Sequence, residues 1–98
     1  MRWRPLSSRE SESVRVTIPS PLLSYTGKRE VTAVGATVAD ALQDLDRQFP
    51  GLRFRMVDEQ DRIRQHMRVF LDSQEIRELE RTVPPGATLH IVQALSGG

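Results

Sequence analysis

A single amphipathic segment constrains the fold of this chain more than any other feature. Apolar residues recur in it at spacings of four, three and four, which places them on one stripe of a helix: Val38, Leu42, Leu45 and Phe49. The polar residues between them are expected to face water: Asp40, Gln43, Asp44, Arg47 and Gln48. Because short strand-like segments flank this helix, its apolar stripe is expected to pack on a sheet.

The ends of the helix are marked as clearly as its stripe. Thr37 precedes it, and Asp40 follows three residues later, which resembles a capping box with the shorter acid in the Glu position. Pro50-Gly51 ends the helix. If the stripe is buried, replacing Leu42 or Leu45 by Ala is expected to cost about 2–5 kcal/mol of stability.

Strands are predicted on both sides of the helix. Apolar and polar residues alternate with a period of two, the pattern of a half-buried strand, in residues 14–18, 28–34, 67–71 and 88–94. Pro19 and Pro21 end the first strand, so the first two strands are expected to form an antiparallel hairpin with a long loop. Residues 52–64 are expected to form a short helical or irregular crossover, and residues 75–83 a short edge strand and a turn.

The predicted order is therefore strand, strand, helix, strand, short strand, strand. It indicates an α+β domain of two layers, with one helix packed on one face of a four- or five-stranded sheet. The domain is expected to span residues 14–94, between a flexible arm at 1–13 and a flexible tail at 95–98. The arm has no continuous apolar stretch, so it is not typical of a secretory signal, and a cytoplasmic location is expected.

Composition excludes several classes of function. The chain of 98 residues has no Cys, which removes disulfides, thiolate zinc sites and Cys nucleophiles. Residues 1–13 hold three Arg and two Glu, and the rest balances at 11 basic and 11 acidic residues, so no nucleic-acid surface is expected. No run of about 18 apolar residues is present to span a membrane. So short a chain has little room for both a core and a deep pocket, which favours a carrier, binding module or subunit over an enzyme.

Neither a metal site nor a nucleotide site is expected. His66 and His90 fall on different predicted elements, without further ligands at the spacing that metal sites need. The sequence has no Gly-rich phosphate loop, so ATP is expected to be bound by a partner and not by this chain. No catalytic residue is predicted.

The sequence closes with Ser96-Gly97-Gly98, shortly after the last predicted strand. Glycine has no Cβ, so this tail could pass through a channel too narrow for other residues and present the α-carboxylate of Gly98 at its tip. A carboxylate is a poor electrophile until it carries a good leaving group. If a partner transferred AMP from ATP to Gly98, sulfide or a persulfide could replace the AMP and give a thiocarboxylate, which is the logic of a covalent group carrier.

The strand order and the terminal Ser-Gly-Gly together resemble the ThiS/MoaD group of ubiquitin-like sulfur carriers, which have a β-grasp fold with a mixed sheet. Within that group, Val16-Thr17-Ile18-Pro19, Leu22 and Thr26-Gly27 are similar to the carriers of cysteine or other thio-metabolite biosynthesis. The resemblance covers about residues 14–98. It implies that Gly98 is the site of adenylation and thiocarboxylation.

The same resemblance assigns the rest of the tail and the partners. Gly97 and Ser96 provide clearance before the reacting group, although many relatives have a small apolar residue where this chain has Ser96. The implied partners are an E1-like adenylating enzyme of ThiF/MoeB type, a sulfur-accepting synthase, and a metalloprotease for release or maturation. Neither nucleic acid nor a membrane is implied.

A docking surface is expected on the sheet face opposite the helix. If Leu89 points into the core, the period of two turns His90 and Val92 outward, and the same argument turns Phe70 outward. These three side chains would form a mixed apolar patch, and Leu95 would anchor the tail in a partner groove. Packing on an ordinary exposed sheet explains the same residues without a function.

Three other functions stay open. The chain could be the small subunit of molybdopterin synthase, a protein modifier that forms amide bonds from Gly98 to target lysines, or an adaptor that binds through its sheet alone. Lys28 is its only lysine, which makes the chain a poor substrate for chains of itself.

Overall fold

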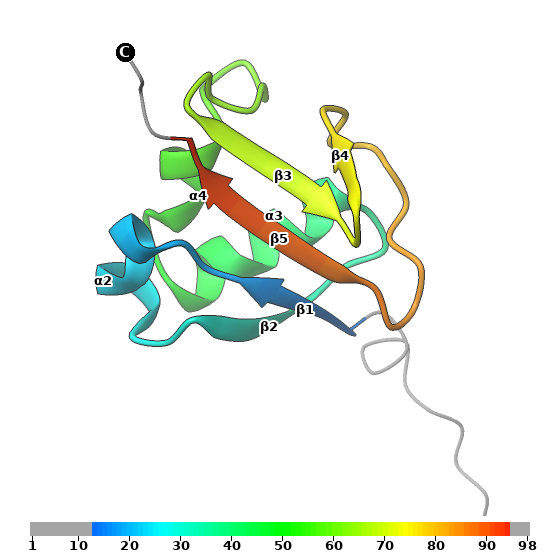
Figure 1. Ribbon diagram of the computed structural model, residues 1–98, viewed down its shortest axis with the longest axis horizontal. Helices are drawn as coiled ribbons and strands as arrows, with labels where there is room; N and C mark the ends of the chain where they lie inside the picture. Colours follow the sequence, from blue (N-terminus) through cyan, green and yellow to red (C-terminus); the bar gives the residue numbers. More distant parts are fainter. Residues whose placement is uncertain (1–12, 95–98) are drawn as a thin grey trace, which may run out of the picture.

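The fold is a sheet with its helices gathered on one side (Figure 1). The computed structural model describes residues 13–94. Its elements, in chain order, are β1 (Ser13–Thr17), η1 (Ser20–Leu22), α2 (Leu23–Thr26), β2 (Glu30–Val34), α3 (Val38–Gln48), α4 (Leu52–Met56), β3 (Met67–Leu71), β4 (Gln74–Ile76) and β5 (Thr88–Gln93). The flexible arm predicted at residues 1–13 lies outside the described residues except for Ser13, which begins β1.

The sheet is mixed and five-stranded, with the order β2-β1-β5-β3-β4. The central strand β5 runs parallel to its neighbour β1, pairing Val16 with Leu89 and Thr17 with His90. Every other neighbouring pair is antiparallel, including the predicted hairpin of β1 and β2. The long loop of that hairpin contains the short helices η1 and α2, which the sequence did not predict. The predicted two-layer α+β architecture is confirmed.

The helix α3 crosses one face of the sheet and carries the predicted apolar stripe. Val38, Leu42 and Leu45 are fully buried, and Phe49 packs against the core from just beyond the end of the helix. The Thr37 side chain accepts a hydrogen bond from the backbone N–H of Asp40 at 3.2 Å, as the capping pattern predicts. The inward residues of the strands complete the core: Val14, Val16, Val31, Ala33, Met67, Val69, Leu71, Ile76, Leu89 and Ile91.

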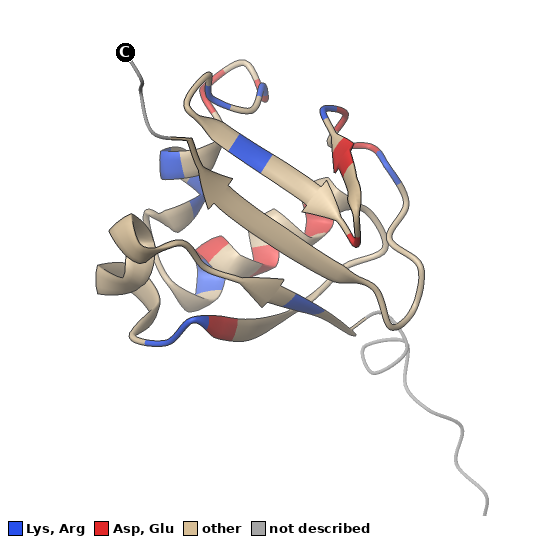
Figure 2. Cartoon of the chain, in the orientation of Figure 1, with Lys and Arg blue, Asp and Glu red and all other residues tan. Residues whose placement is uncertain are grey.

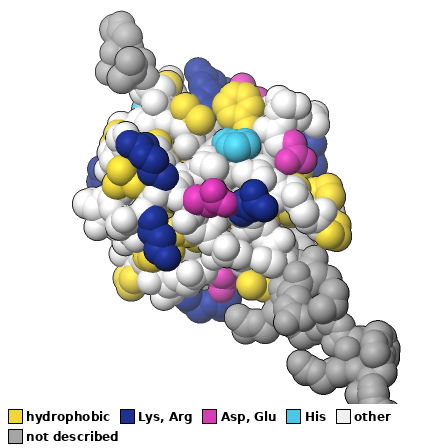
Figure 3. All heavy atoms as spheres, turned by 60° about the horizontal axis from the view of Figure 1, so that its bottom comes forward, with side chains coloured by type: hydrophobic (Ala, Val, Ile, Leu, Met, Phe, Trp, Pro, Cys, Tyr) yellow, Lys and Arg dark blue, Asp and Glu magenta, His cyan; other side chains and the backbone are white. Residues whose placement is uncertain are grey.

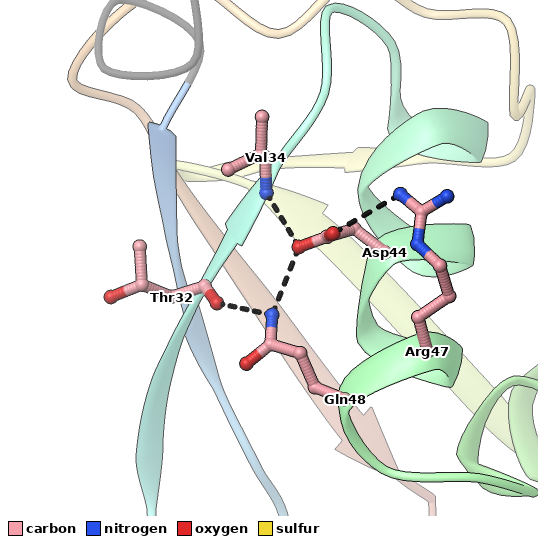
Figure 4. A network of polar contacts seen from close by, with 5 residues as sticks. All are labelled: Thr32, Val34, Asp44, Arg47 and Gln48. Carbon is pink, nitrogen blue, oxygen red and sulfur yellow. Dashed lines mark hydrogen bonds and ion pairs between the residues drawn. The ribbon is translucent and has the colours of Figure 1, made fainter.

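Two residues of α3 that were predicted to face water, Asp44 and Gln48, also bind the backbone of β2. An Asp44 carboxylate oxygen accepts a hydrogen bond from the backbone N–H of Val34 at 3.0 Å, and the Gln48 amide donates to the carbonyl of Thr32 at 2.9 Å (Figure 4). Gln48 also donates to Asp44. Since β2 is an edge strand, these side chains satisfy backbone groups that have no neighbouring strand. Helical periodicity predicted that Asp44 and Gln48 face water, because it carries no information about a strand edge that lies beside the helix.

This hydrogen-bond network favours the ionised form of the Asp44 carboxyl group. Partial burial acts to raise its pKa, but hydrogen bonds from Val34, Arg47 and Gln48 and the charge of Arg47 outweigh burial, so the pKa lies below its usual value. The folded state therefore stabilises the ionised carboxylate.

The crossover between α3 and β3 is part helix and part loop, as predicted. Leu52 and Met56 are buried on one side of α4, which resolves the ambiguity of their spacing in favour of a helix. A single β-bridge between Val57 and Ile63 then closes the loop that leads to β3.

Candidate functional site

The face of the sheet opposite α3 is open, and it carries the three predicted patch residues. Leu89 and Ile91 of β5 point into the core, and the side chains of the intervening residues lie on the other face. Val92 is 41% exposed, whereas Phe70 and His90 are half-buried. Phe70 and His90 are direct partners across β3 and β5. The predicted orientation of all three residues is confirmed, and their role in docking stays a prediction.

His90 is held in place by a residue far away in the sequence. Its Nδ1 lies 3.0 Å from the Thr17 hydroxyl, which belongs to the parallel partner strand β1. This hydrogen bond fixes the ring on the open face, between β1 and Phe70. Sequence analysis did not predict it, because nothing local to His90 indicates which residue of β1 lies beside it.

Charges on the open face are paired. Arg15 lies 3.3 Å from Glu30, and Arg68 lies 3.3 Å from Glu75, in both cases across neighbouring strands. Figure 3 shows hydrophobic side chains scattered among polar and oppositely charged ones over one side of the molecule. Such exposed pairs add little stability, but they leave this face without a strong excess of either charge.

The C-terminal tail begins at a defined place. The backbone N–H of Ala94 donates to the carbonyl of His66 at 2.8 Å, just beyond the end of β5 and before the start of β3. Leu95, Ser96, Gly97 and Gly98 follow directly in the chain and lie outside the described residues. Their predicted roles stay predictions, and Ala94 is the residue at which the chain leaves the described part of the structure.

Three hollows border this point, and sequence analysis missed all of them. The first is lined by Asp58, Arg77 and residues 62–66. The second is lined by Pro19, Ser20, Pro21, Arg29 and residues 91–93. The third is lined by Phe54, Arg55, Arg64 and His66. The residues of the third hollow come from α4, the loop after it and the approach to β3, which no single sequence period connects.

Within residues 13–94, no three His, Asp or Glu side chains gather closely enough to hold a metal ion. No helix in that part of the chain is long and apolar enough to cross a membrane.

A mixed five-stranded sheet with one long helix across it, in this strand order, defines a β-grasp domain of the ubiquitin-like class. Solved structures of that class match it closely. CysO in the Amycolatopsis orientalis BexX/CysO complex is similar with a TM-score of 0.80 and 32% identity, covering 87% of this chain and 99% of that one. SAMP1 from Haloferax volcanii is similar with a TM-score of 0.75 and 26% identity, covering 88% of this chain and 99% of that one.

The chain belongs to the ThiS family, whose model matches residues 16–98. The sulfur carrier protein CysO of Mycobacterium tuberculosis is 25% identical over 92 residues, which cover 88% of this chain and 99% of that protein. The family and this relative confirm the predicted resemblance, and with it the prediction of a carrier rather than an enzyme.

Proposed function

We propose that this chain carries sulfur as a thiocarboxylate on Gly98. The observation that supports this most strongly is that the ThiS family match runs from residue 16 through Gly98, so it includes the tail as well as the folded body. The relatives named as sulfur carrier proteins match over nearly their whole length. The site is therefore the C-terminal carboxylate, with the body serving for recognition.

The chemistry proceeds in two displacements on a partner enzyme. An oxygen of the Gly98 carboxylate attacks the α-phosphorus of ATP, which forms a mixed anhydride and releases pyrophosphate. Sulfide then attacks the carbonyl carbon, the bond to AMP breaks, and a proton leaves the sulfur to give the thiocarboxylate. In this proposal the partner enzyme of ThiF/MoeB type supplies the acid, the base and the nucleotide site, and it is this enzyme that consumes ATP.

The open sheet face and the tail have different roles in binding the partner. Phe70, His90 and Val92 present a partly apolar surface to the partner, while Leu95 anchors the stalk and the small residues Ser96 and Gly97 fit a narrow channel. The structure of a similar CysO in complex with BexX is in keeping with recognition of a partner protein. A sulfur-accepting synthase then takes the sulfur for cysteine or another thio-metabolite, and a metalloprotease acts in release or maturation.

The proposal is tested by intact-protein mass spectrometry. The chain is incubated with a purified ThiF/MoeB-type enzyme, ATP and sulfide. The expected product is the chain with one oxygen replaced by one sulfur, dependent on both ATP and sulfide. If the mass of the chain stays unchanged with enzymes that adenylate other ThiS-family proteins, the proposal is contradicted.

Two tail variants provide matched controls for the site. A chain lacking Gly98 and a chain extended by one Ala after Gly98 are both expected to lose sulfur transfer completely, with an unaltered thermal unfolding curve. A truncated or extended chain that still acquires sulfur would place the reactive group elsewhere.

A protein modifier is the second candidate, favoured by the structural similarity to SAMP1, a small archaeal modifier protein. It would yield protein-sized adducts linked through Gly98 in the same mass spectra. The small subunit of molybdopterin synthase would instead pass its sulfur to a pterin while bound to a larger subunit, and an adaptor would leave Gly98 unmodified.

A further inference from the structure

The hollow beside the tail has an unusual composition. We call its lining residues Phe54, Arg55, Arg64 and His66 the Arg64 platform. Phe54 is 55% exposed, the most exposed large apolar side chain of the described residues. Around it stand cationic groups rather than other apolar ones, and Figure 2 shows basic residues on α4 near the end of β5. The platform is thus neither core nor an ordinary apolar patch.

Arg64 is fixed by contacts at both its backbone and its side chain. Its backbone N–H donates to Met56 at 2.8 Å, and its carbonyl accepts from Met67 at 2.9 Å. The guanidinium Nε donates to the carbonyl of Phe54 at 2.7 Å, and the guanidinium carbon lies 4.5 Å from the centre of the Phe54 ring. Because Nε is engaged, the two terminal nitrogens form an oriented pair of donors, the geometry that grips a carboxylate by both its oxygens.

Two acidic residues in the loop after α4 are already engaged. Asp61 pairs with Arg53 at 2.9 Å, and Asp58 lies 3.9 Å from Arg62. Backbone hydrogen bonds to Asp58 from Arg62 and then Gln60, with the charges of Arg62 and Arg64, keep its pKa below the usual value. Among the described residues, no carboxylate lies within 4 Å of the Arg64 guanidinium.

The position of the platform connects it with the tail. The carbonyl of His66, one of its residues, accepts the hydrogen bond from Ala94 at 2.8 Å, and Leu95 follows. A partner that binds the tail from Leu95 onward therefore comes close to His66, and so to the platform. An ion pair that becomes desolvated on docking adds both orientation and affinity.

We propose that the Arg64 platform docks a carboxylate-bearing segment of the protein that receives the tail, with an apolar group of that segment packed on the edge of Phe54. This inference rests on the proposed function, since it is tail engagement that brings a partner to this position. A nucleic acid fits less well, because basic and acidic residues balance over residues 13–94 and because Arg64 already covers a face of the Phe54 ring.

The first arm of the test needs no partner enzyme. The full chain, labelled with ¹⁵N, is titrated by NMR with the peptide acetyl-Glu-Glu-Leu-Glu-Glu-amide, with the same peptide carrying Gln in place of Glu, and with inorganic phosphate. Saturable shifts of the Arg64 Nε signal and of amides in residues 53–66 are expected with the acidic peptide only. The amide shifts should vanish in R64Q and persist in R81Q, which removes one positive charge next to Glu78 in the loop before β5.

The second arm measures activation of the tail by the adenylating enzyme. R64Q removes one charge-assisted contact, so it is expected to raise the KM for the carrier about tenfold with little change in kcat. R81Q should leave KM and kcat unchanged. R64K keeps the charge without the planar fork and should fall between them. Circular dichroism melting checks that each variant is folded.

The outcomes separate the two proposals. If wild type is adenylated and R64Q has the KM of wild type, the docking inference is overturned and the carrier function stands. If no enzyme adenylates wild type, the carrier function fails, and the peptide titration still decides whether the platform binds carboxylates. Equal shifts with phosphate, or shifts that survive in R64Q, overturn the inference.

Discussion

The two faces of the sheet differ in the burial and the chemistry of their side chains. On the α3 side, the strand residues are apolar and almost wholly buried, and the helix stripe fills the space between them. On the open side, the outward residues include two ion pairs, Arg15–Glu30 and Arg68–Glu75. The same side carries the half-buried ring of Phe70 and the hydrogen bond between His90 and Thr17. Stability is concentrated on one face, so substitutions on the other face are expected to change the free energy of unfolding little.

The difference also explains how so small a carrier can work. A chain of 98 residues that built a second covered face would have no sheet surface left to present. By leaving one face uncovered, the protein offers a rigid surface that continues directly into the tail at Ala94. Under the proposed function, β5 is the strand that leads from the face that recognises the partner to the tail that reacts.

The largest expected effect comes from the covered face. Replacing Leu45 by Ala removes a fully buried side chain of α3 and should lower the free energy of unfolding by about 2–5 kcal/mol. Urea unfolding measures the loss. Val92→Ala on the open face is the matched control and should change stability by no more than about 0.5 kcal/mol; equal losses in the two variants would break the distinction between the faces.

The second prediction concerns the close approach between β2 and α3. A Cβ added at Gly35 would lie 2.5 Å from the backbone nitrogen of Ala41, so Gly35→Ala must push the helix away from the sheet. We expect a loss of about 1–3 kcal/mol in urea unfolding. Gly86→Ala isolates the other reason for a glycine: its φ is +84° but the space around it is open, which should cost about 1 kcal/mol. A neutral Gly35→Ala would show that the approach is not a constraint.

Asp44→Asn is expected to have a smaller, pH-dependent effect. The variant should lose about 1–2 kcal/mol at neutral pH, because the charge-assisted hydrogen bonds to Val34, Gln48 and Arg47 weaken. The pKa of Asp44 is lowered by folding, so its contribution is fully present above the unfolded-state pKa of about 4 and is lost as the pH falls through the lower folded-state pKa.

The measurement is the free energy of unfolding of wild type and Asp44→Asn against pH. The gap between the two curves should be constant near neutral pH and close as the solution is acidified below about pH 4. Gln43→Glu, on the exposed side of α3, controls for general charge effects. A gap that widened on acidification would contradict the role given to the Asp44 carboxylate.

The smallest effect on stability is predicted for the open face, where the effect on function should be large. Val92→Glu is expected to change the free energy of unfolding by no more than about 0.5 kcal/mol, since the side chain is 41% exposed. The same substitution puts a charge into the docking patch and should slow adenylation of the tail. Gln43→Glu, which adds the same charge on the exposed side of α3, is the comparison. Unchanged rates would argue against docking through this face.

Much of the fold was predictable because it depends on local periods. The stripe of α3 and the alternation of the strands follow from which side chains must leave water, and the structure confirms both. The segment 52–64 was less readable because Leu52 and Met56 suit either a strand or a helix. The Arg64 platform was therefore missed: Phe54 and Arg64 meet only after the Val57–Ile63 bridge folds the loop back.

The sequence by itself determined the apolar periods, the helix boundaries and the Gly-Gly ending, since each is written in neighbouring residues. Only the tertiary structure decided which polar groups meet: Asp44 with the edge of β2, and Thr17 with His90 across 73 residues. The reason is that burial of apolar side chains can be read from their spacing along the chain. A hydrogen bond depends instead on distances that exist only once the core has packed.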